Sequence, residues 1–300
     1  MASLKKKKSR FSWSKLSPQL ALIPALSITV ICFIGASFWS ILIAFTASRE
    51  FPDYAIIGFK QFLRLFKNPL WILALKNVLF LGIGSIGSIV LGFLLAICMN
   101  KDIKGESAFR TMILYPLAVS LIITGLVWQW ILNPGMGIQQ YVRNLGFAGF
   151  TFDWIARPER VMYTVVMAAI WQSTGFYMVL LLAGLKGVDS EVWKAAKVDG
   201  IPPLRFYLEI IMPMMKYTFL TCIILLFMGV VKSYDLIVAM TNGGPGGRST
   251  VPAYFILNAY FGRQNIGLAS AGSALMLLFV VILLLILFVT NRILRRGDNQ

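Results

Sequence analysis

The sequence predicts an all-α integral membrane protein with six transmembrane helices and both termini in the cytoplasm. Of its 300 residues, 58% are hydrophobic and only 13% are charged, and a soluble domain cannot bury that much apolar surface. Six apolar runs are long enough to cross a hydrocarbon core of about 30 Å as helices. We place these spans at residues 20–46, 71–99, 109–132, 161–185, 217–240 and 268–294.

Lys and Arg are distributed unevenly between the two sides that these spans define. With the N-terminus inside, the cytoplasmic segments hold 17 Lys or Arg residues and the outer segments hold nine, which obeys the positive-inside rule. The chain therefore divides into a basic cytoplasmic segment at 1–19, the spans at 20–294 and a cytoplasmic tail at 295–300. We interpret the lysine run at 5–8 as an orientation signal, so the net charge of +16 does not indicate a nucleic acid partner.

The first three spans carry signals for insertion, packing and bending. The first is interpreted as a retained span, because its apolar run of about 25 residues lacks a small-residue cleavage site. In the second, Gly84, Ser88 and Gly92 recur every four residues and predict close approach of a neighbouring helix. In the third, Pro116 predicts a bend, and the Asn-Pro-Gly sequence at 133–135 predicts the turn that ends the span.

Polar residues in the fourth and fifth spans are the candidates for a substrate path. The fourth span has a polar patch near mid-membrane, where cavity lining and hydrogen bonding between helices both remain open. In the fifth, Lys232 and Asp235 are three residues apart, which predicts a pair on one helix face near the outer end. That pair fits a structural role or a substrate contact. The substrate-path candidates are Gln172, Ser173, Thr174, Tyr234 and Asp235.

The remaining motifs argue against metal, disulfide and nucleotide chemistry. The outer loop at 241–247 holds four glycines and a proline, which predict a tight turn, followed by an aromatic interfacial segment. This loop lacks the strand-and-helix context of a phosphate site, so we reject nucleotide binding. The chain has no histidine, and cysteines 32, 98 and 222 fall within spans. We therefore predict no metal site and no disulfide framework.

A polar connection between the fourth and fifth spans, residues 188–213, is here called the hook. Asp189 or Ser190 is placed to cap a first helix, and Glu191 lies in its first turn, near the positive end of the helix dipole. Gly200 is placed to end that helix. The hook is therefore expected to be an ordered pair of short helices.

The second hook helix is expected to begin at Pro203 and to run to about Ile211, before Pro213 ends it. The first hook helix is expected to present small residues on one face, at a spacing of three and four positions. A helix that lies on lipid headgroups and a helix that docks on another protein are both open. The residues of that face are Val192, Ala195, Ala196 and Asp199.

Several motifs together resemble a known family. Ala195-Ala196, three residues, Gly200, nine residues, and then Ile210-x-Met212-Pro213 resemble the "EAA" signature of the inner-membrane permease subunits of ABC importers. Other motifs over most of the chain are similar to the carbohydrate-uptake branch, of maltose type or glycerol-phosphate type. They are Arg110-Thr111 to Pro116, Trp128-Gln129-Trp130 with Asn133-Pro134, Ile170-Trp171-Gln172, Ala183-Gly184-Leu185, and Thr241-x-Gly243-Gly244-Pro245 with Thr250.

This resemblance implies that the first hook helix is a coupling helix, which docks in a groove of a cytoplasmic ATPase. The chain departs from the family at one point, because Lys194 stands where the signature usually has Glu. If that glutamate contacts a basic residue on the ATPase, Lys194 would repel the residue unless the partner has changed as well. The size-dependent docking of the small residues is less affected. The residues carried over as coupling residues are Glu191, Lys194, Ala195, Ala196, Asp199, Gly200, Ile210 and Pro213.

The resemblance also implies an assembly in the bacterial inner membrane that imports a sugar or sugar derivative. Its partners would be a second permease subunit in a heterodimer, two copies of the ABC ATPase, membrane lipid, and a periplasmic or lipid-anchored sugar-binding protein. ATP and Mg would be used by the ATPase. This chain has no Walker-type phosphate loop, so it is expected to bind no cofactor and not to be an enzyme.

Three other classes of membrane protein fit the sequence less well. An ion-driven secondary transporter would need ionisable residues at mid-membrane on several spans, and only Lys232 and Asp235 qualify. A membrane-embedded enzyme would need a cluster of His, Asp or Glu at the membrane edge, and the 12 acidic residues are scattered among loops. An ABC permease for a non-sugar solute is disfavoured by the resemblance alone.

Overall fold

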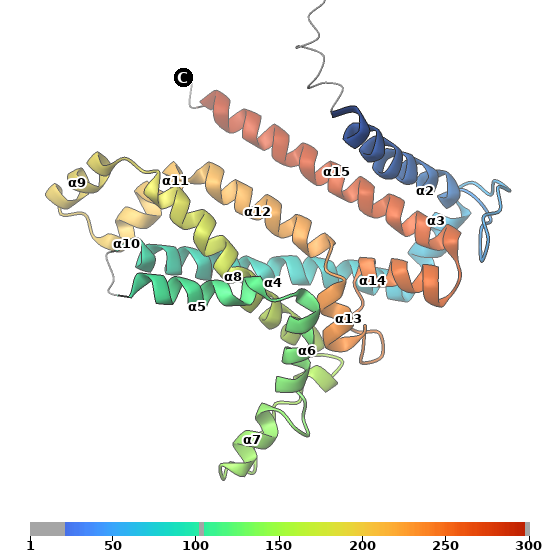
Figure 1. Ribbon diagram of the computed structural model, residues 1–300, viewed down its shortest axis with the longest axis horizontal. Coiled ribbons are helices and arrows are strands. Elements are labelled where there is room, and N and C mark those ends of the chain that lie inside the picture. Colours follow the sequence, from blue (N-terminus) through green and yellow to red (C-terminus); the bar gives the residue numbers. More distant parts are fainter. Residues whose placement is uncertain (1–21, 102–104, 298–300) are drawn as a thin grey trace, which may run out of the picture.

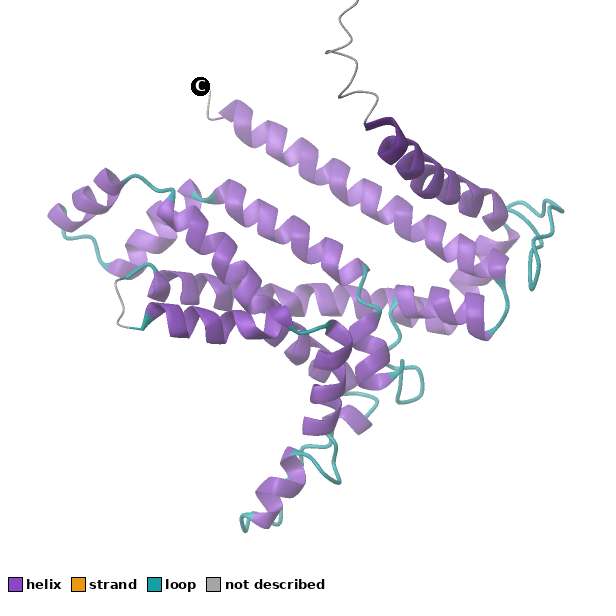
Figure 2. Ribbon diagram, viewed as in Figure 1, coloured by secondary structure: helices purple, strands orange, loops and turns teal. Residues whose placement is uncertain are grey.

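The computed structural model of the chain describes residues 22–101 and 105–297, and those residues form helices joined by loops, with one isolated bridge between Thr46 and Ile56 and no strand (Figure 2). The predicted N-terminal segment at 1–19 lies outside these residues, as does the end of the predicted tail. The helices are α2 (Ala36–Ala44), α3 (Lys60–Lys67), α4 (Pro69–Met99), α5 (Glu106–Ala118), α6 (Leu121–Ile131), α7 (Ile138–Asn144), α8 (Val161–Lys186), α9 (Ser190–Val198), α10 (Pro203–Arg205), α11 (Met212–Met214), α12 (Lys216–Val231), α13 (Asp235–Thr241), α14 (Pro252–Leu257) and α15 (Ile266–Gly297), with a 3₁₀ turn, η2, at Trp154–Ala156.

Four helices of the described chain are long and apolar enough to cross a membrane, and two bent helix pairs raise that number to six if each pair is one span. The prediction of an all-helical membrane protein is therefore confirmed. The four are Leu22–Ala44, Pro69–Met99, Val161–Lys186 and Ile266–Thr290, and the bent pairs are α5 with α6 and Pro203–Met214 with α12.

The centre of the bundle is the crossing of α4 and α8, which lie side by side (Figure 1). The predicted small-residue register makes this contact possible. A methyl group added at Gly92 would lie 2.8 Å from the backbone nitrogen of Met178, and one added at Gly84 would meet the side chain of Val166 at 2.7 Å. Ser88 is fully buried between them. The prediction of close helix packing at these positions is confirmed.

The third predicted span is broken rather than bent. Helix α5 ends two residues after Pro116, and α6 leaves it at 97°. Val119 is extended, and the hydroxyl of Ser120 accepts a hydrogen bond from the backbone N–H of Ile122 at 3.3 Å, so a new helix is capped there. Gly125 then lets α6 pack against α13. The proline weakens the first helix, and the serine starts the second.

The fifth predicted span, 217–240, is also interrupted. Helix α12 ends at Val231, and α13 begins at Asp235. Lys232 and Asp235 therefore belong to different elements, and no ion pair joins them in the part of the chain that the structure describes. The prediction that they share one helix face is wrong, because the helix does not continue between them.

Three segments of the described chain have π-helical hydrogen bonding, which inserts one extra residue into a turn. One of them, η3 (Phe206–Ile211), is the middle part of the second hook helix. That helix runs without a break from Pro203 to Met214. Pro213 lies in the last turn of this helix and does not end it, so the predicted end at Ile211 is wrong. The segments are η1 (Val30–Gly35), η3 (Phe206–Ile211) and η4 (Asn258–Gly262).

The hook lies at one end of the bundle, beside the start of α5, and α3 and α14 lie at the opposite end (Figure 1). Helices α2 and α15 pack side by side as a separate layer, and α3 packs on α15 and α4. A second cluster of buried residues holds this layer, in which Trp71 meets Phe255 with ring centroids 5.3 Å apart. The two ends of the bundle therefore carry different candidate sites.

Candidate coupling and substrate sites

The first hook helix, α9, is capped at both ends by its own sequence. The carboxylate of Asp189 accepts a hydrogen bond from the backbone N–H of Glu191 at 2.9 Å. At the other end Gly200 has a φ of 65°, a conformation that favours glycine. The N–H of Ile201 then donates to the carbonyl of Ala196 at 3.1 Å, which completes a Schellman motif. Both predicted caps are confirmed.

Aromatic side chains fix α9 to the second hook helix. The ring centroid of Trp193 lies 5.0 Å from that of Phe206 and 6.0 Å from that of Tyr207. Ala196 is buried beneath them, and Val192 is half-buried. This inner face belongs to the main core of the protein, so the orientation of the hook is set by packing as well as by caps.

The predicted face of small residues on α9 is only partly buried. Ala196 is buried and Val192 is half-buried, whereas Ala195 and Asp199, at the edge of the same face, are exposed. Neighbouring residues on a helix are about 100° apart. With Trp193 packed against the second hook helix, Ala196 is therefore turned toward the core and Ala195 toward solvent. Ala196 therefore holds the hook together, and Ala195 is available to a partner.

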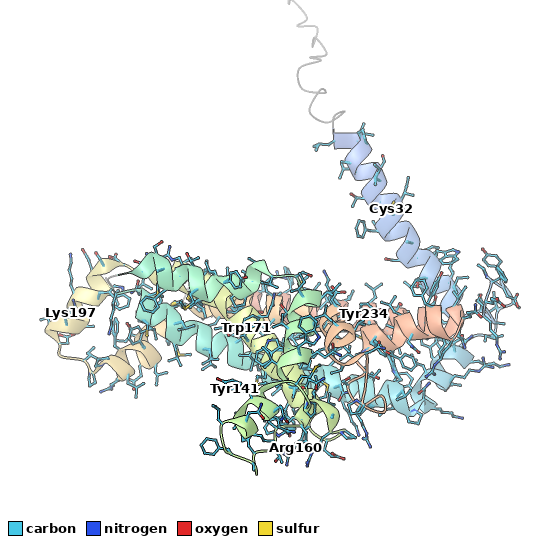
Figure 3. All side chains as sticks on the ribbon, turned by 60° about the horizontal axis from the view of Figure 1, so that its bottom comes forward. Cys32, Tyr141, Arg160, Trp171, Lys197 and Tyr234 are labelled. Atoms are coloured by element: carbon cyan, nitrogen blue, oxygen red, sulfur yellow. The ribbon has the colours of Figure 1, made fainter. Side chains whose placement is uncertain are left out.

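The outer face of the hook is partly apolar, which the sequence motifs did not reveal. Val198 is 87% exposed and Leu204 is 73% exposed, although both lie among charged residues. Lys197 stands at the outer end of the hook (Figure 3). A signal for this apolar surface was present in the sequence. Val198 follows Ala195 by three residues and stands between two charged residues, on the polar side of the helix. Glu191, Lys194 and Pro213 are also exposed, and Ile210 is half-buried.

A cavity of 140 Å³ lies between α4, α6, α8 and α12. Two of the substrate-path candidates, Gln172 and Ser173, line it, and the hydroxyl of Ser173 donates to the carbonyl of Ala169 at 2.6 Å. Ser85 is 4% exposed, and its hydroxyl has no hydrogen-bond partner among the described residues. The lining is Leu81, Ser85, Leu121, Ala169, Gln172, Ser173, Tyr177, Leu226, Gly229, Val230, Ser233 and Leu236.

Three predicted substrate-path residues do not line this cavity. Thr174 is buried, and its hydroxyl donates to the carbonyl of Ile170 at 2.6 Å. Tyr234 stacks on Tyr254, with ring centroids 6.4 Å apart, and Asp235 is exposed. The cavity instead gains polar groups that the sequence reasoning missed. These are Ser85, Tyr177 and Ser233, which are ordinary residues in apolar helices and gave no local signal.

The loop Thr241–Thr250, which extends the segment predicted to lie on the outer side and is here called the outer loop, is held in part by long-range hydrogen bonds. The side-chain amide of Asn77, on α4, donates to the carbonyls of Arg248 at 2.7 Å and Thr250 at 2.8 Å. The hydroxyl of Tyr254 donates to the carbonyl of Asn242 at 2.9 Å. The predicted turn is present, and it is fixed to the body of the protein by residues far away in the sequence.

Residues 88–298 match the family described as binding-protein-dependent transport system inner membrane component. A probable ABC transporter permease from Pyrococcus horikoshii is 31% identical, over 87% of this chain and 91% of that protein. The trehalose/maltose transport system permease MalF of Thermococcus litoralis is 27% identical, over 87% and 88%.

Among solved structures, a bacterial ABC transporter involved in the import of the acidic polysaccharide alginate has the same fold. Its matching chain has a TM-score of 0.77 at 20% identity, over 95% of this chain and 98% of that chain. The family match includes the whole hook and the cavity-lining parts of α8 and α12. The chain is therefore a member of the binding-protein-dependent transport family, as one of its inner-membrane components.

Proposed function

We propose that the protein is the translocating subunit of an ABC importer for a sugar or sugar derivative. The trehalose/maltose permease among its relatives supports the sugar cargo. Six spans with both termini in the cytoplasm fit the four long helices and two bent pairs, together with the excess of Lys and Arg on the hook side. On this proposal, 20–294 form the permease domain between the basic segment 1–19 and the tail 295–300.

The observation that carries the proposal is the outer face of the hook. Caps and aromatic packing hold α9 in one orientation, yet Val198 and Leu204 expose apolar surface that nothing in the described chain covers. Ala195 is also exposed, and because its side chain is only a methyl group it allows another surface to approach closely. A cytoplasmic ATPase that covers this face would move the hook as a unit when it closes on ATP.

The cavity supports a second permease subunit. Ligand sites usually enclose about 300–1,000 Å³, and the cavity that Gln172 and Ser173 line has 140 Å³. A sugar path therefore needs a second wall, which a homologous subunit in a heterodimer would supply. In this chain Gln172, Ser173 and Ser85 offer hydrogen bonds to hydroxyl groups, and Tyr177 offers a ring. ATP and Mg would be used by the ATPase, with no cofactor on this chain.

Co-purification tests this function. The tagged chain is isolated in mild detergent from cells that express the whole transport operon, and ATP hydrolysis is measured with periplasmic extract and a panel of sugars. We expect a co-purifying P-loop ATPase, a second permease, and sugar-dependent turnover. A chain isolated without any ATPase would contradict the proposal and favour an ion-driven carrier. Turnover that responds only to non-sugar solutes would contradict the cargo.

A matched pair of variants tests the docking face. Val198→Asp places a charge on the outer hook, whereas Leu145→Asp places one on an exposed leucine, 62% accessible, beyond the end of α7. Both proteins should be inserted in the membrane normally, because neither residue packs inside the fold. We expect Val198→Asp alone to lose the ATPase from the purified complex. Equal retention of the ATPase by both variants would overturn the assignment of this face.

A further inference from the structure

Helix α3 has three distinct faces. Gln61 and Leu65 are buried against the bundle. Lys60, Arg64 and Lys67 follow one another at spacings of four and three residues, so they form one exposed cationic stripe. No acidic residue lies within the helix, and the ion pairs found among the described residues include none of these three cations.

An apolar stripe runs beside the cationic one. It consists of Phe59, Leu63 and Phe66, which are 70%, 60% and 52% exposed. Each residue of this stripe precedes a residue of the cationic stripe by one position, which is a rotation of about 100° around the helix. The two exposed stripes therefore adjoin along the whole length of α3.

The orientation of α3 is fixed by its inner face. The side-chain amide of Gln61 donates to the carbonyl of Thr46 at 3.1 Å. The ring of Phe62 lies 5.3 Å from that of Phe45 and 5.9 Å from that of Phe59. With the inner face held in this way, α3 cannot turn its apolar stripe into the bundle.

Connectivity places α3 at the level of a membrane surface. It follows the candidate span Leu22–Ala44 and is joined to the span α4 by a single residue, Asn68, whose side chain caps α4. Lys67 is thus two residues before the N-terminal end of an apolar helix. A helix at that level, with an apolar stripe beside a cationic one, matches the geometry of amphipathic helices that lie in the interface of a bilayer.

We propose that α3 is a binding site for anionic phospholipid. Phe59, Leu63 and Phe66 enter the boundary between headgroups and acyl chains, while Lys60, Arg64 and Lys67 contact the phosphates and any further negative charge of the headgroups. An anionic lipid is favoured over a docking protein for two reasons. The cationic stripe adjoins an apolar stripe, and α3 is joined directly to the span α4, so both stripes can lie at the membrane surface. Each cation near an anionic surface contributes about a fivefold preference.

Native mass spectrometry of the full chain in mixed micelles tests this site. Bound phosphatidylglycerol is compared with bound phosphatidylcholine for the wild-type chain and for the double variant Arg64→Gln, Lys67→Gln. The matched control is Arg248→Gln, Arg263→Gln, which removes the same charge from two exposed arginines near the same end of the bundle. We expect the preference for phosphatidylglycerol to fall about 25-fold in the first variant and to stay unchanged in the control.

Two outcomes would overturn the proposal. Equal phosphatidylglycerol preference in the α3 variant and the wild type would show that the helix does not select anionic lipid. An equal fall in both double variants would show a general charge effect without a site. A third arm uses Leu63→Ser, Phe66→Ser, which should weaken both lipids. If instead that variant keeps both lipids and loses affinity for the solute-binding protein, α3 is a protein-docking surface and the lipid site is wrong.

Discussion

The hook and the outer loop Thr241–Thr250 are both short, glycine-containing connections, but they are stabilised by different means. In the hook, Asp189 and Gly200 close the two ends of α9 through bonds to backbone groups within a few residues. In the outer loop, local bonds such as the one between the hydroxyls of Thr241 and Ser249 are joined by two from Asn77, more than 170 positions away in the sequence. The ends of α9 are thus determined locally, whereas the loop is also tied to a distant part of the bundle.

This difference separates two mechanical roles. A locally capped helix keeps its shape when the bundle rearranges, so it is suited to move as a unit and to transmit force. A loop bonded to α4 moves when α4 moves. Its position therefore depends on the arrangement of the spans, at the end of the bundle opposite the hook. The following changes test this contrast.

The largest effect is expected for Asn77→Leu. The substitution leaves the carbonyls of Arg248 and Thr250 without their donor, because the leucine side chain offers no hydrogen. We expect the free energy of unfolding to fall by roughly 3 kcal/mol, measured by thermal unfolding in detergent. Asn68→Asp is the control on the same helix, because a carboxylate still accepts the N–H of Leu70. Equal stability of both variants would place the support of the loop elsewhere.

The next effect is expected for Trp193→Ala, which removes the ring that joins the two hook helices. The loss of half-buried aromatic packing should cost about 2 kcal/mol, confined to the hook. Hydrogen exchange of the α9 amides should therefore accelerate while the midpoint of global unfolding stays constant. Trp193→Phe should restore most of the protection. A fall in the global midpoint would contradict this prediction and would show that Trp193 also supports the main core, to which the inner face of α9 belongs.

A matched pair of glycines gives a smaller effect. Gly200 and Gly246 have φ values of 65° and 60°, and an added methyl group would meet no neighbour at either position. Alanine at each should therefore cost about 1 kcal/mol locally. Only Gly200→Ala is expected to lower ATP-driven uptake in membrane vesicles. If Gly246→Ala lowers uptake equally, the outer loop also transmits force.

The smallest effect is expected at Asp153, in the loop before α8. A hydrogen bond from Arg157, at 2.7 Å, lowers the pKa of this carboxyl below its ordinary value of 3.8. The pair therefore stabilises the fold above that value, and the contribution is lost as the pH falls through the lower folded pKa. Because the pair lies at the protein surface, the difference in unfolding free energy between wild type and Asp153→Asn should be barely measurable at pH 7 and smaller still at lower pH. A large difference at pH 7 would contradict this ranking.

The sequence was sufficient where structure depends on neighbouring residues. The caps of α9 could be predicted because their signals, Asp189 and Gly200, lie within one short segment. The close approach of a neighbouring helix to α4 could be predicted because Gly84, Ser88 and Gly92 have a regular spacing, although that spacing did not show that the neighbour is α8. Each of these features follows from local geometry, which a single chain records directly.

Features that depend on distant packing could not be predicted in the same way. The interruption of the fifth span at Lys232–Tyr234 contains neither glycine nor proline, so the apolar pattern suggested a continuous helix. The inward turn of Ala196 follows from Trp193 packing on Phe206. Ser85 joins the cavity only because four helices converge there. Lone serines are common in such helices and carry no signal of that convergence.

The π-helical segment Phe206–Ile211 sets the rotational phase between the hook and the span that follows it. Its extra residue turns everything beyond it by about 100° relative to a regular α-helix. A graft of α9 into another protein must therefore carry this segment with it, since a graft that ends at Arg205 would present α9 to its partner at the wrong angle. Deletion of one residue within 206–211 would have the same result without changing the surface chemistry of the hook.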